Sequence, residues 1–320
     1  MARPRTLGPR HALAPIVAAL MCVACGPPPG TVDRGGAPSP KAPTVDPTAP
    51  PRPPMVTPGP RLSRDVAPTA YALVLDVDPD QPMFHGEVTI DVAITVATEQ
   101  LWLHAVFLEI DDAVIEIGGV RETLAVTARD GLIGLDLGRP VQGAARLTLR
   151  YRGWASPTDP VGLFTQTTDG ASYLFSQLES MYARRVLPCF DEPGWKVPWQ
   201  VTLVVPPGLI AASNTPEVAR APRADGKVAI RFATTPPMPS YLLAIAVGPF
   251  DVVEVGPLGR ARVPARVLVA AGRGADAAVA VAETPRIVDA LEAYLDRPLP
   301  LPSSTAWRCR RSRARWRTPG

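Results

Sequence analysis

The middle of the chain alternates between apolar and polar residues in short runs. Residues 71–77 and 87–96 follow a two-residue period, which is typical of strands that bury one face. Turn-forming pairs such as Pro79-Asp80 and Asp130-Gly131 separate these runs from others. The further runs lie at 101–104, 132–137, 145–151, 201–205, 228–232 and 242–247. Because no segment with a helical period lies between them, the pattern predicts an all-β domain of the β-sandwich type.

The pattern changes near the C-terminal end. Residues 275–295 are rich in alanine and favour a helix, with Pro285 as a point where that helix would kink or restart. This first strong helical signal predicts a second domain after the sandwich. We place the β-domain at residues 61–256 and the beginning of an α+β domain at 257–302.

The N-terminal end has the pattern of an export signal. A basic start is followed by an apolar stretch at 12–24 that is too short to span a bilayer, which predicts a signal peptide over residues 1–25. The small residues before Cys25 resemble the end of a bacterial lipoprotein signal, although Cys22 stands where leucine is usual. We therefore expect lipidation of Cys25 and a membrane-anchored lipoprotein in the periplasm or at the cell surface. The alternative is ordinary cleavage nearby, which would give a soluble exported protein.

A proline-rich segment follows the signal. Residues 26–60 contain 13 prolines and almost no large apolar residues, so they cannot bury a core. The composition predicts a disordered, extended linker between the anchor and the folded domain.

Charge and cysteine content narrow the function classes. The net charge is +3, and the basic excess lies at the two ends of the chain. The middle therefore gives no reason to expect nucleic acid as a partner. The four cysteines, which include Cys189 and Cys309, form neither a disulfide framework nor a metal-like pair in the folded region.

The most specific motif lies in the second half of the β-domain. Residues 174–193 read Leu-Phe-Ser-Gln-Leu-Glu-Ser-Met-Tyr-Ala-Arg-Arg-Val-Leu-Pro-Cys-Phe-Asp-Glu-Pro, and Ser-Asn-Thr-Pro follows at 213–216. A run at 238–250 ends in Val-Gly-Pro-Phe, and Leu-His-Ala stands upstream at 103–105. In this order the motifs resemble the N-terminal β-domain of the aminopeptidase N family of zinc metallopeptidases, over about residues 61–302.

The resemblance implies a saddle-like β-sandwich beside a zinc-bearing catalytic domain, of which residues 257–302 would be the beginning. By motif position, Gln177 and Glu179 are expected to bind the first residue of a peptide substrate. A carboxylate at Glu179 suits this role because it is the natural partner of a protonated α-amine. Without the resemblance, the residues alone favour a simpler role for Glu179, at a solvated turn.

The segment 189–193, Cys-Phe-Asp-Glu-Pro, is expected to be scaffold. Its two adjacent carboxylates point in opposite directions on an extended chain, so they are poorly placed to share one acid–base site. We expect Arg184, Arg185 and Lys196 to pair with them.

The zinc-binding residues of that family are not found in this sequence. Peptide hydrolysis there needs a His-Glu-x-x-His helix and a later glutamate, which hold zinc and activate a water molecule. The three histidines are His11, His85 and His104, and no two of them are four residues apart. We therefore expect no catalytic residue and no metal site in this chain, with zinc as the cofactor of the full-length family enzyme.

Residues 303–320 depart from the family pattern. The family continues Pro-Leu-Pro-Lys-Leu-Asp and later Gly-Ala-Met-Glu-Asn, whereas an arginine-rich tail follows Pro302 here. When the last base of each codon is read with the first two of the next, the genetic code permits the family sequence through Gly-Ala-Met-Glu-Asn. We interpret the tail as out of frame, after one lost or two gained bases near codon 302. A rival interpretation takes its six arginines, with Trp307 and Trp316, as a genuine segment for nucleic acid or another anionic surface.

The leading function is therefore the N-terminal fragment of an exported, lipid-anchored zinc aminopeptidase. The parent would remove N-terminal amino acids from peptides, and this chain would be inactive alone. Its partners would be peptide substrates in the parent and the membrane through the anchor. The alternative is a non-catalytic lipid-anchored β-domain that binds peptides or a partner protein. Codons for His-Glu-x-x-His in the downstream DNA would distinguish the two.

Overall fold

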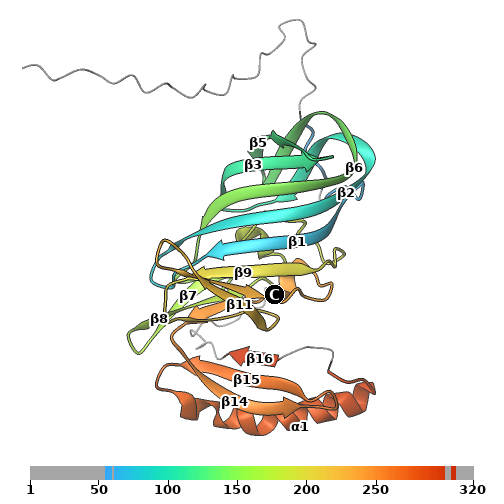
Figure 1. Cartoon of the computed structure of the whole chain (residues 1–320). Helices are drawn as coiled ribbons and strands as arrows, with labels where there is room; N and C mark the ends of the chain where they lie inside the picture. Colours follow the sequence, from blue (N-terminus) through green and yellow to red (C-terminus); the bar gives the residue numbers. More distant parts are fainter. Residues whose placement is uncertain (1–54, 60, 300–303, 308–320) are drawn as a thin grey trace, which may run out of the picture. The chain divides into compact units, whose positions relative to one another are not determined.

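The computed structural model describes residues 55–59, 61–299 and 304–307. The expected export signal with Cys25, most of the linker and residues 308–320 of the tail lie outside the described residues. In the described part, a nine-stranded sheet has the order β11-β12-β9-β1-β2-β6-β3-β4, with β5 paired to β6 (Figure 1). Its strands are β1 (Val66–Asp76), β2 (Met83–His104), β3 (Glu109–Ile117), β4 (Val120–Thr123), β5 (Ala125–Arg129), β6 (Leu132–Trp154), β9 (Trp199–Val205), β11 (Glu217–Pro222) and β12 (Val228–Phe232).

The remaining strands of the described part form two smaller sheets. A four-stranded sheet has the order β10 (Ile210–Ala212), β13 (Ala246–Gly248), β8 (Ala171–Gln177) and β7 (Gly162–Thr168). A three-stranded sheet has the order β14 (Phe250–Leu258), β15 (Val263–Ala270) and β16 (Ser304–Trp307). The helical elements are the 3₁₀ turns η1 (Ala183–Arg185), η2 (Ser240–Leu242) and η3 (Gly274–Ala277), and the helix α1 (Ala278–Leu295).

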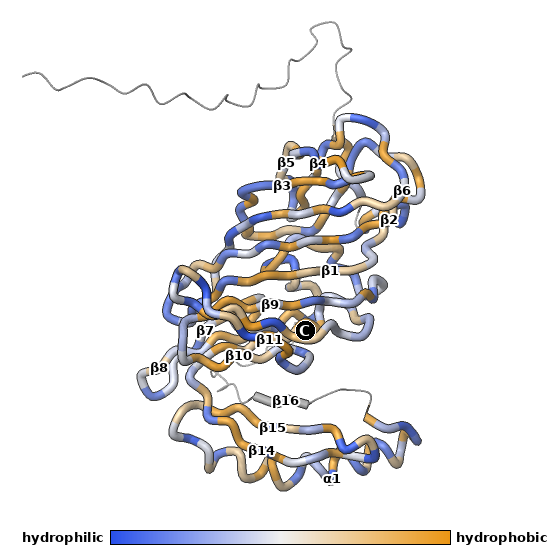
Figure 2. Tube along the Cα trace, viewed as in Figure 1, coloured by the Kyte–Doolittle hydropathy of each residue, from blue (hydrophilic) through white to orange (hydrophobic). Residues whose placement is uncertain are grey.

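The predicted all-β class is confirmed, and the alternation of the sequence is the reason. Hydrophobic and hydrophilic residues alternate along the strands (Figure 2), so that Leu73 and Leu75 of β1 are buried between more exposed neighbours. Leu163 and Leu174 of the four-stranded sheet belong to the same buried cluster as these leucines. The two sheets therefore share one apolar core.

Several details differ from the sequence prediction, among them the joining of the runs 132–137 and 145–151 in one strand, β6. The runs 87–96 and 101–104 form one strand, β2, because the irregular pairing between Ile94 and Gln100 breaks the alternation without ending the strand. The run 242–247 contributes only its end to a strand, since η2 precedes β13. The helix α1 is continuous through Pro285.

The expected domain limits fall inside packed segments. The boundary between 256 and 257 lies within β14, and Phe250 of that strand packs in one cluster with Phe175 of β8 and Leu268 of β15. At the other end, the backbone N–H of Val56 donates to Gln100 Oε1 at 3.2 Å, so the last residues of the predicted linker contact β2. The strand β16 pairs in parallel with β15, although the sequence of the tail did not predict a strand there. Within the described ranges, no helix has the length and apolar character needed to cross a membrane.

Candidate functional site

The two residues expected to bind substrate lie at the end of β8. Gln177 is the last residue of that strand, and Glu179 follows it with one buried residue, Leu178, between them. Because Leu178 turns inward, the side chains of Gln177 and Glu179 are both exposed. Gln177 Oε1 accepts a hydrogen bond from the backbone N–H of Glu179 at 3.1 Å, and the peptide bond from Glu179 to Ser180 is cis. The Glu179 carboxylate forms no hydrogen bond or ion pair with another side chain in the described part of the protein.

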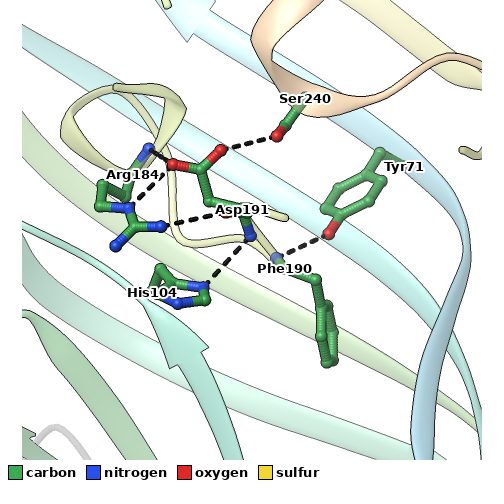
Figure 3. A network of polar contacts seen from close by, with 6 residues as sticks. All are labelled: Tyr71, His104, Arg184, Phe190, Asp191 and Ser240. Carbon is green, nitrogen blue, oxygen red and sulfur yellow. Dashed lines mark hydrogen bonds and ion pairs between the residues drawn. The ribbon is translucent and has the colours of Figure 1, made fainter. Parts of the chain in front are cut away.

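A buried carboxylate, Asp191, fixes the segment that follows Glu179 (Figure 3). Asp191 Oδ2 accepts from Arg184 Nε at 2.8 Å and from the backbone N–H of Arg184 at 3.2 Å. Asp191 Oδ1 accepts from the Ser240 hydroxyl at 2.7 Å. Since Arg184 lies in η1 and Ser240 in η2, one carboxylate holds together the loop after β8 and the loop before β13.

The backbone around Asp191 is attached to the large sheet. The N–H of Asp191 donates to His104 Nδ1 at 3.2 Å, and the N–H of Phe190 donates to the Tyr71 hydroxyl at 3.0 Å. Cys189 and His104 exchange two backbone hydrogen bonds of 2.9 and 3.1 Å. The loop that bears Glu179 is therefore connected through Asp191 to strands β1 and β2.

Asn214 anchors the neighbouring loop in a similar way. Its Nδ2 donates to the carbonyl of Leu242 at 2.7 Å, and its Oδ1 accepts from the N–H of Ala244 at 2.8 Å. The amide thus spans the end of η2, next to the Ser240 contact with Asp191. The Ser-Asn-Thr-Pro motif at 213–216 accordingly has a structural role in this site.

As expected, the two carboxylates of residues 189–193 have separate partners. Asp191 points toward Arg184, whereas Glu192 accepts a hydrogen bond from the backbone N–H of Leu62 at 2.9 Å, so the two carboxylates do not share a site. The expected partners are corrected in two cases. Arg185 pairs with Asp159 at 3.5 Å rather than with this segment, and Lys196 is exposed without an ion pair to any described residue.

Two titratable groups next to Asp191, the Cys189 thiol and the His104 imidazole, are kept neutral by their surroundings. Burial raises the pKa of the Cys189 thiol, which keeps it protonated at neutral pH. Burial and then the Arg184 guanidinium lower the pKa of His104 below its ordinary value of 6.5. His104 is therefore neutral at pH 7, as its acceptance of the Asp191 N–H requires.

Sequence reasoning identified the motifs but not their contacts. His104 and Ser240 lie in motifs that carry the family resemblance, and Tyr71 begins the alternating run 71–77, yet their distance in sequence from residues 189–191 concealed their joint role. Among the described residues, no three or more His, Cys, Asp or Glu side chains form a group that could hold a metal ion.

Comparison with known proteins agrees with the motif evidence. Residues 67–242 match the family model of the Peptidase M1 N-terminal domain. The chain is 32% identical over 252 residues to the puromycin-sensitive aminopeptidase of Caenorhabditis elegans, covering 76% of this chain and 26% of that protein. It is 31% identical over 202 residues to aminopeptidase N of Acetobacter pasteurianus, covering 61% of this chain and 56% of the relative. The chain thus spans between about a quarter and just over half of the length of these two proteins.

Proposed function

Because the chain belongs to the peptidase M1 family through its N-terminal domain, we propose that it is the N-terminal part of a zinc-dependent aminopeptidase. The parent would remove N-terminal amino acids from peptides. Its relatives are named aminopeptidases. The observation that carries the proposal is the exposed Glu179 carboxylate beside Gln177, on a loop fixed by buried Asp191.

In this proposal the chain contributes binding and orientation. Glu179 accepts a hydrogen bond from the protonated α-amine of the peptide, and such a charge-assisted bond is stronger than a neutral one. Gln177 orients the Glu179 backbone through its Oε1 and is itself exposed, so that its amide can also bind the peptide. Zinc, held outside the described residues, would supply the activated water when bound.

The proposed role of Glu179 is tested by Glu179→Gln in the protein translated with a restored frame. We expect kcat/KM for aminoacyl substrates to fall about 10- to 100-fold, because a hydrogen bond to a charged group contributes about 1.5–3 kcal/mol. Glu99→Gln is the matched control, since Glu99 is an exposed carboxylate without an ion pair among the described residues. Equal activity of the two variants would remove Glu179 from the substrate site.

We also propose that the tail after Pro302 is out of frame. Sequencing of the gene from codon 290 through several hundred downstream codons tests this directly. A restored frame should encode Gly-Ala-Met-Glu-Asn and then His-Glu-x-x-His. A stop codon after Gly320 with no such motifs in any frame would contradict the enzyme proposal and favour a β-domain that binds peptides or a partner.

Lipid anchoring through Cys25 is a separate proposal, supported by the signal-like sequence before it. Stable anchoring requires more than one acyl chain, as a multiply acylated cysteine would provide. In a bacterial host, the wild-type chain should sediment with membranes, and Cys25→Ala should release it into the soluble exported fraction. Release of both proteins would indicate ordinary cleavage instead.

A further inference from the structure

His104 joins strand β2 to the segment that carries Asp191. It is the last residue of β2 and is only 6% exposed. Its backbone pairs with Cys189, and its Nδ1 accepts the N–H of Asp191 at 3.2 Å. The same Asp191 binds Arg184 and Ser240, the two residues that fix the loops next to Glu179. The imidazole is thus one hydrogen bond away from the backbone of the residue that carries the central carboxylate of the site.

The groups around the imidazole define how it responds to a proton. The Arg184 charge disfavours the imidazolium, whereas the carboxylates of Asp191 and Glu192 and a hydrogen bond to the Cys189 backbone favour it. Its neighbour on β6 is Leu132, which brings no charge. Burial and Arg184 oppose the imidazolium more strongly than the two carboxylates and the Cys189 backbone favour it, so the pKa of His104 is lowered.

We propose that His104 is an acid-sensitive link, and that its protonation detaches residues 189–191 from β2 and loosens the loop that carries Glu179. Protonation of His104 Nδ1 converts this atom from a hydrogen-bond acceptor into a donor. The imidazolium N–H and the Asp191 backbone N–H then face each other, and the hydrogen bond between the two residues is lost. Protonation also places a second cation beside Arg184, whose own partner is Asp191. The link is intact above the ordinary histidine pKa and is lost as the pH falls through the lowered value.

The test uses the full chain and two measurements between pH 7.5 and pH 4.5. The pKa of His104 is measured by proton NMR of the three histidines. The His104 signal is identified as the one that is missing from the spectrum of His104→Asn. Hydrogen exchange, expressed as protection relative to an unstructured peptide at each pH, reports on residues 178–191 and on the core strand β9. We expect protection of 178–191 to fall about tenfold or more with a midpoint at the His104 pKa, while β9 stays protected.

His104→Asn should abolish this acid response, because an asparagine Oδ1 can accept the Asp191 N–H but does not titrate. His85→Asn, at an exposed position of the same strand, should retain it. The proposal is overturned if protection persists where NMR shows His104 protonated, if His104 does not titrate above pH 4.5, or if 178–191 and β9 lose protection together. Should His104→Asn fail to fold, the His104 signal is assigned by elimination from His11→Asn and His85→Asn, and the wild-type comparison of NMR and exchange midpoints decides.

Discussion

Two buried tyrosines next to the site differ in what their hydroxyl groups do. Tyr71 accepts the N–H of Phe190 and stacks on Trp199 with ring centroids 4.0 Å apart. Tyr151 lies over Gly86, and its buried hydroxyl has no hydrogen-bond partner among the described residues. Burial raises the pKa of both phenols, so both are neutral. The Tyr71 hydroxyl should therefore stabilise the folded protein, whereas the Tyr151 hydroxyl should not.

Tyr71→Phe should lower the free energy of unfolding by about 1–3 kcal/mol, because it leaves the buried Phe190 N–H without an acceptor. Tyr151→Phe should leave the free energy of unfolding unchanged or raise it by about 1 kcal/mol, since it removes a buried polar group that has no partner. Urea denaturation at pH 7 measures both, and each substitution is the control for the other. A larger loss for Tyr151→Phe would contradict these assigned roles.

At the scale of elements, one carboxylate attaches α1 to the hairpin of β14 and β15. Glu292 is 5% exposed and accepts the N–H groups of Arg260 and Leu299, each at 2.7 Å. Gly259 makes this approach possible, because a Cβ there would overlap the Glu292 carboxylate. The hydrogen bond from Arg260, followed by that from Leu299, lowers the pKa of Glu292 below its ordinary value of 4.5.

This lowered pKa predicts a stability contribution that is present above pH 4.5 and lost as the pH falls through the folded-state value. Glu292→Gln should therefore be less stable than the wild type at pH 7, and the difference should shrink below pH 4.5. Urea midpoints at pH 7 and at acid pH measure the effect. Glu283→Gln, at an exposed position on the same helix, should show little change at either pH. A constant difference for Glu292→Gln at all pH values would contradict the ionised contact.

At the scale of the whole described unit, the residues after the predicted boundary share a core with the β-domain. Leu268 of β15 is fully buried in a cluster with Phe175 and Phe250. The Tyr173 hydroxyl, from β8, accepts the N–H of Ala271 at 2.9 Å. Strands β14 and β15 should therefore unfold together with the sheets before them.

Leu268→Ala should lower the stability of this unit by about 2–5 kcal/mol, as expected for a cavity in a packed core. Unfolding followed by circular dichroism and by tryptophan fluorescence should give coincident curves, both shifted by the substitution. Leu291→Ala is the matched control, because that leucine is 52% exposed on α1 and should change stability by less than about 0.5 kcal/mol. Two separate transitions, of which only one shifts, would show that residues after 256 form an independent unit.

The sequence by itself determined the fold class, the helix at the C-terminal end and the family, because alternation, alanine content and motif order are local properties of the chain. It also placed Arg184, together with Arg185 and Lys196, among the expected partners of the carboxylates at 191 and 192, and Arg184 does bind Asp191. The sequence did not show which of Arg184 and Arg185 would bind Asp191. That choice depends on the 3₁₀ turn η1, in which successive residues point about 120° apart, so that only one of them can face the carboxylate. Only the tertiary structure decided that Tyr71, His104 and Ser240 surround residues 190–191. Those contacts depend on the order of β1, β2 and β9 in the sheet and on the position of η2, which no local pattern in the sequence encodes.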